Sequence, residues 1–340
     1  MNRRDRLYAC PKSAVGFCKV FGNLTTCKNL YYRKNHMKIS FSDIERKENQ
    51  NRDRIMRQVE ELRYEVFSLI ESSIVELNNN LPSLAKRPIK LSTSNNNVFH
   101  AIPKNECYEI EIGYKGMMEL LSYAELIADE LYEITKIEFN KHSEAFFQIW
   151  LMAIIFHEIS HILRGHNDYP RDEMNSLRYQ AFESEADADS FQSTFFIFNS
   201  LPRVQQLFSD TGHVTPPEKI IELFGYIFTY YFNFLQINSS SDDCNHQKPI
   251  IRRFYTISSN EKVAHFFLKE SELPYTEKRI NTLKRFIICK LVISFEKIME
   301  YNNEKINMED IINSAIWMGE LDNILKESKI FSYNKIKDQK

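Results

Sequence analysis

The sequence contains little glycine and no glycine-rich motif. Only 8 of its 340 residues are glycine, and neither a GxGxxG nor a GxxxxGK[ST] pattern occurs. Loops that cradle phosphate groups need closely spaced glycines, because their backbone must approach the ligand. This lack argues against a nucleotide-binding enzyme.

Closely paired cysteines are also missing. The six cysteines form no CxxC pair, and the basic start of the chain, 1–6, is followed by no apolar stretch typical of a secretory signal. We therefore expect no disulfide framework and a cytoplasmic location. Cys10, Cys18, Cys27 and His36 are separated by seven to eight residues, wider gaps than those of usual zinc-ligand pairs.

No apolar run reaches the length of a membrane span. The two longest are Ala145–Phe156 and Phe224–Ile237, and both are shorter than the ~18–20 residues that a spanning helix needs. We predict a soluble protein in which both runs are buried core helices. For the second, aromatic-rich run, a membrane-surface position is the less favoured alternative.

Charge is nearly balanced overall but unevenly distributed. The formal net charge is -2, which disfavours nucleic acid as a partner. Residues 1–40, however, hold nine Lys or Arg against one acidic residue. We predict a basic, loosely ordered extension over 1–36, a core with the candidate site over 37–210, and a helical C-terminal lobe over 211–340.

Hydrophobic spacing predicts a mainly helical protein with a small β element. Apolar residues recur at helical spacing over 52–80, and Val98–Ile102 and Tyr108–Gly113 have the composition and alternation of strands. Everything after Lys115 is predicted to be helical, with segments at 115–135, 143–164, 175–200, 216–237, 260–269, 276–302 and 308–327. The predicted fold class is α+β, predominantly helical.

The strongest motif is His157-Glu158-Ile159-Ser160-His161. Positions i and i+4 share one face of a helix, so both imidazoles can ligate one metal ion. Zinc accepts imidazole nitrogen, and a catalytic zinc site needs a third protein ligand and an open position. Glu158 is displaced around the helix, where it can act on water at the metal as a general base. Gly165 is placed to end this helix.

The third ligand is expected on the acidic helix that follows. This helix offers two nested pairs, Glu183 with Asp187 and Glu185 with Asp189. The buried stripe of the helix is marked by its phenylalanines, and Glu183 and Asp187 lie nearer to it than the other pair does. We predict Glu183 as the ligand and Asp187 as the acceptor for the distal N–H of a zinc-bound histidine. A solvated acidic face is the alternative.

These residues resemble the gluzincin-type zinc peptidases, in which HExxH supplies two metal ligands and a downstream ExxxD helix the third. The continuation HEISHILRGH is also similar to that of integral-membrane peptidases with several membrane helices, but the length and helical build are more similar to the Lit-type phage-exclusion peptidases. The resemblance covers Phe156 to Phe191. It implies a zincin-like core, bound Zn²⁺ and an intracellular endopeptidase acting on a protein substrate, with a role in phage defence.

A residue that stabilises the oxyanion of the transition state is expected downstream. His246 is the first candidate, and Arg252, His213 and Tyr255 are others. His166 is interpreted as a polar helix-end residue, with a place behind a metal ligand as the less favoured alternative. Two alternatives to a peptidase stay open: a non-catalytic, zinc-stabilised interaction module and a latent toxin-type regulator. Glu158 separates the first of these from an enzyme, because a structural zinc site needs no base and is usually closed by a fourth ligand, often cysteine.

Overall fold

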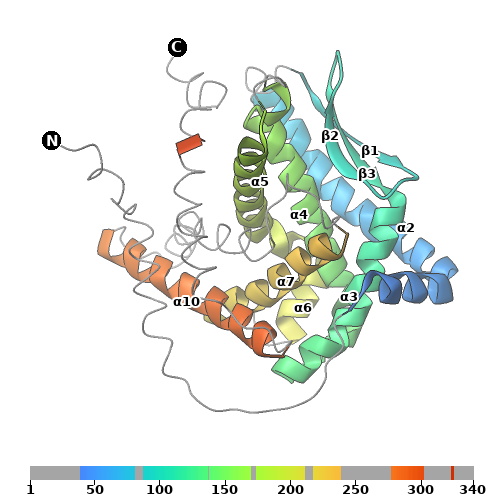
Figure 1. Cartoon of the computed structure of the whole chain (residues 1–340), viewed down its shortest axis with the longest axis vertical. Coiled ribbons are helices and arrows are strands. Elements are labelled where there is room, and N and C mark those ends of the chain that lie inside the picture. Colours follow the sequence, from blue (N-terminus) through green and yellow to red (C-terminus); the bar gives the residue numbers. More distant parts are fainter. Residues whose placement is uncertain are drawn as a thin grey trace.

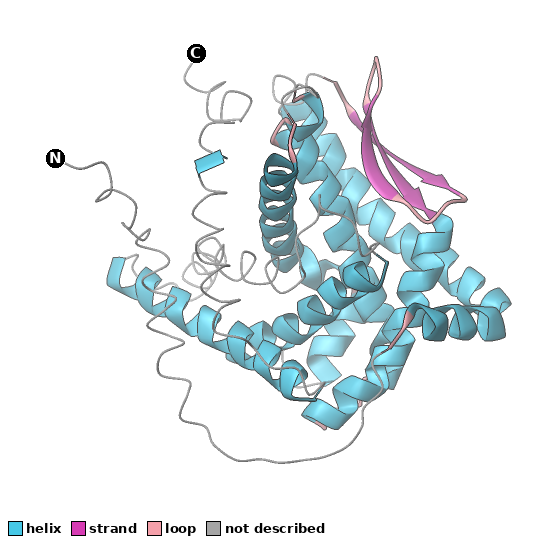
Figure 2. Ribbon diagram, viewed as in Figure 1, coloured by secondary structure: helices cyan, strands magenta, loops and turns pink. Residues whose placement is uncertain are grey.

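The protein is mostly helical, with one small sheet at one side (Figures 1 and 2). The computed structural model describes residues 39–80, 87–136, 138–169, 174–210, 217–238, 277–301 and 323–324. The predicted α+β, predominantly helical class is confirmed. The predicted extension 1–36, the helix 260–269 and nearly all of 308–327 lie outside the described residues.

The helices of the described residues are α2 Phe41–Asn80, α3 Tyr114–Thr135, α4 Ser143–Leu163, α5 Ser176–Ile197, α6 Pro202–Asp210, α7 Pro217–Asn238 and α10 Glu277–Tyr301. Short 3-10 turns follow α3, α4 and α5: η2 Asn140–His142, η3 His166–Asp168 and η5 Phe198–Ser200. Five of the helices predicted between 115 and 302 lie in the described residues. They are present as α3, α4, α5, α7 and α10, with nearly the predicted bounds. Helix α6 was not predicted, and the predicted boundary at 210/211 falls between α6 and α7.

Helix α2 begins earlier than the predicted residue 52. Its start is explained by Ser40, whose backbone N–H donates to the Asp43 carboxylate at 2.9 Å while its hydroxyl accepts from the Asp43 N–H at 3.4 Å. Such reciprocal capping satisfies donors that the first turn leaves unpaired. Asn51 has non-helical angles, φ -129° and ψ 19°, so the long helix is kinked there.

The sheet has three strands, β1 Ile89–Ser94, β2 Phe99–Pro103 and β3 Tyr108–Gly113, in the order β1-β3-β2. Strand β3 pairs parallel with β1 and antiparallel with β2, and its Tyr108, Ile110 and Ile112 are buried. The two predicted strands are present, whereas β1 was missed because it alternates weakly. Strand β2 is thus an edge of the sheet, and it lies against α4.

Helix α4 lies at the centre of the fold and contacts every described α-helix from α2 to α7 and the strands β2 and β3. Among the described residues, α4 is the one helix that is long and apolar enough to cross a membrane, with a mean hydropathy of 1.5 over 18 residues. It is longer than the predicted apolar run because His157–Leu163 extends it. Since 83% of that window is buried inside the fold, α4 is placed as a core helix.

Helices α4 and α5 approach closely because α5 presents small side chains. Ala186 is fully buried, and the Ser190 hydroxyl donates to the Ala153 carbonyl of α4 at 2.6 Å. Further along, Phe191 and Phe195 form the predicted buried stripe and pack against Phe224 of α7. The Trp150 indole N–H donates to the Ile227 carbonyl at 2.9 Å, which joins α7 to α4.

Glu130, on α3, provides a test of this core. Burial raises its pKa from 4.5 to about 6, although a hydrogen bond from Tyr230 opposes the shift. The folded state therefore binds more protons than the unfolded state between these two values, and the free energy of unfolding falls as pH rises through that window. We expect Glu130→Gln to raise the free energy of unfolding by about 1–2 kcal/mol at pH 8.

The measurement is urea unfolding at pH 8 and pH 5, where the gain should be smaller at pH 5. Glu133→Gln, on a half-exposed residue of the same helix, is the control. An equal effect of Glu130→Gln at both pH values would contradict the placement of Glu130.

Candidate metal centre

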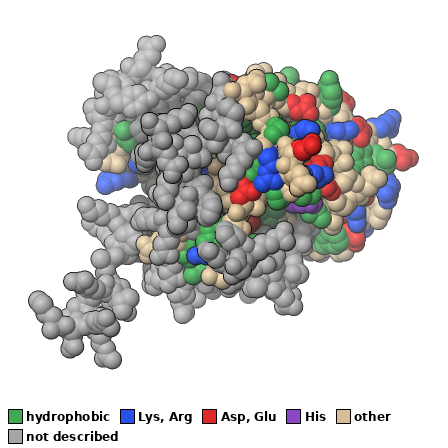
Figure 3. Space-filling model, turned by 90° about the horizontal axis from the view of Figure 1, so that it is seen from above, with side chains coloured by type: hydrophobic (Ala, Val, Ile, Leu, Met, Phe, Trp, Pro, Cys, Tyr) green, Lys and Arg blue, Asp and Glu red, His purple; other side chains and the backbone are tan. Residues whose placement is uncertain are grey.

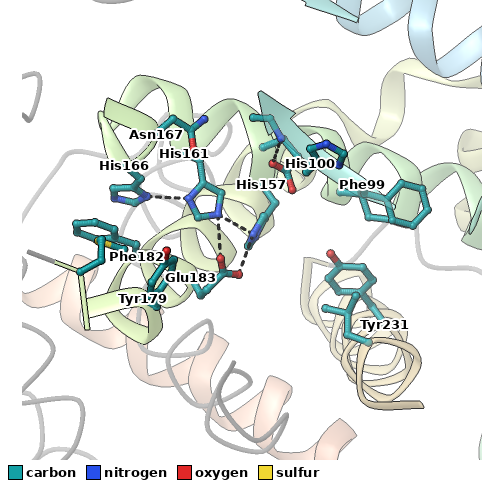
Figure 4. A pocket seen from close by; sticks show the side chains of 15 residues that line it. Phe99, His100, His157, His161, His166, Asn167, Tyr179, Phe182, Glu183 and Tyr231 are labelled. Atoms are coloured by element: carbon teal, nitrogen blue, oxygen red, sulfur yellow. Dashed lines mark hydrogen bonds and ion pairs between the residues drawn. The ribbon is translucent and has the colours of Figure 1, made fainter. Parts of the chain in front are cut away.

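Three side chains from α4 and α5 converge on one point. His157 and His161 lie one turn apart on α4, and their Nε2 atoms are 3.0 Å apart. Glu183 of α5 faces both, with one oxygen 3.2 Å from His157 Nε2 and the other 3.4 Å from His161 Nε2 (Figure 4). These three residues, which are the predicted ligands, form a group that could hold a metal ion.

The distal nitrogen of His157 faces a buried carboxylate. Asp187 Oδ1 lies 3.0 Å from His157 Nδ1, and the Asp187 side chain is 1% exposed. The carboxylate favours the tautomer with hydrogen on Nδ1, which leaves the Nε2 lone pair directed at the ligand group. The structure thus places Asp187 where the periodicity of α5 predicts it.

The electrostatics of the group favour a cation. Burial alone would lower the pKa of His157, but Asp187 and Glu183 outweigh it and raise that pKa to about 10. Burial would likewise raise the pKa of Glu183, but His161 and His157 hold it well below its usual value. The Glu183 carboxylate therefore stays ionised, and the group favours positive charge at this point.

His161 has a different distal partner, His166. Its Nδ1 lies 3.0 Å from Nδ1 of His166, and Nε2 of His166 lies 3.1 Å from Glu185. The less favoured interpretation of His166, as a residue behind a metal ligand, therefore fits these contacts better than that of a polar helix-end residue. The available clue was Gly165, which ends the helix as predicted. Its positive φ of 76° turns the chain back toward the site.

The second acidic pair of α5 also faces α4. Asp189 accepts from the Arg164 guanidinium at 2.8 and 2.9 Å and from the Ser160 hydroxyl at 2.9 Å. Arg164 also lies 3.4 Å from Glu185. Neither member of this pair contacts the ligand nitrogens of His157 or His161, which favours the predicted choice of Glu183 and Asp187. The alternative of a solvated acidic face is wrong, because all four acids have partners on or directly after α4.

Glu158 borders the same cavity and is held by the sheet. Its Oε2 accepts a hydrogen bond from the backbone N–H of Ala101 in β2 at 2.7 Å. Burial raises the pKa of the Glu158 carboxyl. A raised pKa suits a group that must take up a proton and then release it near neutral pH. The sequence offered no clue to the amide of Ala101.

A cavity of about 410 Å³ opens beside the ligands. Its walls come from β2, with Phe99 and His100, from α5, with Tyr179, and from α7, with Tyr231. Tyr231 lies across the cavity from the histidines (Figure 4), and histidine surface is visible from one face of the molecule (Figure 3). His100, which belongs to no sequence pattern, lines this cavity. The candidates His246, Arg252 and His213 lie outside the described residues.

Comparison with protein-family models, with curated proteins and with solved structures finds no match to this chain. The resemblance to gluzincins and Lit-type peptidases therefore depends on the motif residues alone and stays a prediction.

The ligand assignment is tested by Glu183→Gln. The substitution removes the carboxylate that faces both imidazoles, so we expect metal content to fall from stoichiometric to sub-stoichiometric after dialysis. Elemental mass spectrometry of the purified proteins measures this directly.

Asp189→Asn is the matched control on the same helix, because Asp189 contacts Arg164 and Ser160 rather than the two ligand histidines. It should retain the metal of the wild type. Loss of metal in Asp189→Asn but not in Glu183→Gln would reverse the register assigned to α5.

Proposed function

We propose that this protein is an intracellular, zinc-dependent endopeptidase. The observation that carries the proposal is the position of Glu158: a half-buried carboxylate adjoins a His157–His161–Glu183 ligand group, and both open on one cavity. A metal with an open position and a base beside it are the requirements for metal-assisted hydrolysis.

The ligand group fits zinc in donor type and in spacing. Two imidazole nitrogens and a carboxylate oxygen are a common catalytic set for this metal. Tetrahedral zinc with bonds of ~2.0–2.1 Å would place its ligand atoms about 3.3 Å apart. The two Nε2 atoms are 3.0 Å apart, and each lies close to a different oxygen of Glu183, at 3.2 Å for His157 and 3.4 Å for His161. His157 also has the carboxylate partner that is typical of a zinc ligand, whereas the distal partner of His161 is an imidazole.

Zinc, when bound, polarises a carbonyl group and lowers the pKa of water toward neutrality. The proton transfers are assigned to Glu158, which takes a proton from the attacking water and delivers it to the leaving amine. The N–H of Ala101 restrains the Glu158 carboxylate during both transfers. Tyr231 lines the same cavity (Figure 4). Among the described residues it is an alternative to His246 as the hydrogen-bond donor to the oxyanion.

A protein or peptide is the substrate class that we propose. The motif residues are those of peptidases, and the cavity walls present apolar and aromatic side chains such as Phe99, Ile154 and Leu235 together with the polar site. A role in phage defence is part of the proposal through the Lit-type resemblance, and so is a cytoplasmic location.

A structural zinc module is the less favoured function. Such a site is usually closed by a fourth protein ligand, whereas the ligand group among the described residues has three members and no cysteine. Cys107 is free and buried and is not one of them; Cys244 lies outside the described residues.

Glu158→Gln tests the enzymatic proposal. The amide keeps the shape of the side chain but cannot accept a proton, so hydrolysis should fall by roughly 10²–10⁴-fold while metal content and melting temperature stay near wild type. The readout is the appearance of new protein N-termini, by terminal-peptide mass spectrometry, after incubation with a cell extract.

Wild-type protein treated with a zinc chelator, and the same sample after zinc is restored, are the controls. New N-termini that persist in Glu158→Gln would contradict a peptidase of this mechanism. A latent regulator would be inactive until its trigger is supplied, so extracts of phage-infected and uninfected cells should be compared.

A further inference from the structure

We propose that His166 and Glu185 are positioning residues that hold His161 in the tautomer and orientation needed for zinc ligation. This inference builds on the proposed zinc site but does not depend on peptidase activity. It rests on an unbroken hydrogen-bonded chain, Glu185–His166–His161, with contacts of 3.1 and 3.0 Å. Figure 4 shows the contact between His166 and His161.

The direction of the chain follows from its two ends. Glu185, as a carboxylate, can only accept, so Nε2 of His166 carries the hydrogen in their 3.1 Å contact. A neutral imidazole has one donor and one acceptor, which makes Nδ1 of His166 the acceptor. The Nδ1 of His161 is then the donor, and its Nε2 lone pair is directed at His157 and Glu183. The opposite direction would place a hydrogen on Nε2 and prevent ligation.

His166 is held in place by its surroundings on several sides. Its ring stacks on Phe182, with centroids 4.1 Å apart and planes 5° apart, and only 5% of the side chain is exposed. The turn that carries it ends at Asp168, which Arg87 binds at 2.8 Å. Tyr108 of β3 donates to the same carboxylate. A residue held from α5 and from the sheet has little freedom to move, as positioning requires.

The two ligand histidines are therefore supported unequally. His157 faces the Asp187 carboxylate directly, whereas His161 reaches the Glu185 carboxylate through a second imidazole. Both acids come from α5, two residues apart. This arrangement gives Glu185, the member of the pair that was not chosen as ligand, a function in the same site.

The test is zinc affinity, measured by competition with a chromophoric chelator. His166→Phe preserves the stack on Phe182 but removes both nitrogens, and Glu185→Ala removes the acceptor. We expect each to raise the zinc Kd by about 10–100-fold, the usual cost of losing an outer partner. Glu185→Gln, which still offers a carbonyl oxygen, should recover most of the affinity that Glu185→Ala loses.

Asp189→Asn is the matched control, because Asp189 shares Arg164 with Glu185 but contacts neither histidine. It should bind zinc as the wild type does. The metal-free melting temperature of each variant shows whether the fold has changed. A zinc Kd for His166→Phe and Glu185→Ala equal to that of the wild type would overturn the inference.

Nitrogen-15 NMR of the zinc-loaded wild type adds a readout that needs no substitution. Hydrogen on Nδ1 of His161 and on Nε2 of His166 is expected, and hydrogen on Nδ1 of His166 would contradict the proposed direction. Wild-type protein that binds no zinc would instead defeat the proposed function itself. The two failures are thus separable.

Discussion

The close pairing of α4 with α5 is the contact on which the site depends. The small side chains Ala186 and Ser190 let the two helices approach, and the hydrogen bond of Ser190 to the Ala153 carbonyl marks that approach. At this separation, imidazoles on one helix meet carboxylates on the other without bridging residues. A larger side chain at position 186 would push the helices apart and separate the acid ligand from both histidines.

The acidic side chains of α5 give this pairing an electrostatic cost as well as a function. Together with Glu158, the acids near α4 are Glu183, Glu185, Asp187 and Asp189, of which Arg164 contacts only Glu185 and Asp189 among the described residues. Like charges held close together in a partly buried site repel each other. A bound cation reduces that repulsion, so metal binding and the stability of the α4–α5 pair are linked.

The sequence predicted those parts of the site that depend on helical periodicity. HExxH and the spacing of phenylalanines on α5 were sufficient to choose Glu183 and Asp187, because ligand and core residues follow the same helix geometry. Ala101 was not assigned, and a place for His166 behind a ligand was only the less favoured interpretation, because these contacts arise from a strand crossing and from a chain reversal at Gly165. Strand β1 and helix α6 were missed for a similar reason: their burial comes from neighbours in space. The division at 210/211 stays a prediction.

The groups around the cavity come from parts of the sequence that lie at different distances from one another. These distances affect the order in which the groups come together during folding. The three ligands lie within one pair of consecutive helices, and Glu183 follows His157 by 26 positions. The amide that restrains Glu158 comes from 57 residues earlier, and Tyr231 from a helix beyond both. Local contacts form before distant ones. A half-folded chain in which α4 has paired with α5 can thus bring the three ligand residues together before the amide of Ala101 restrains Glu158.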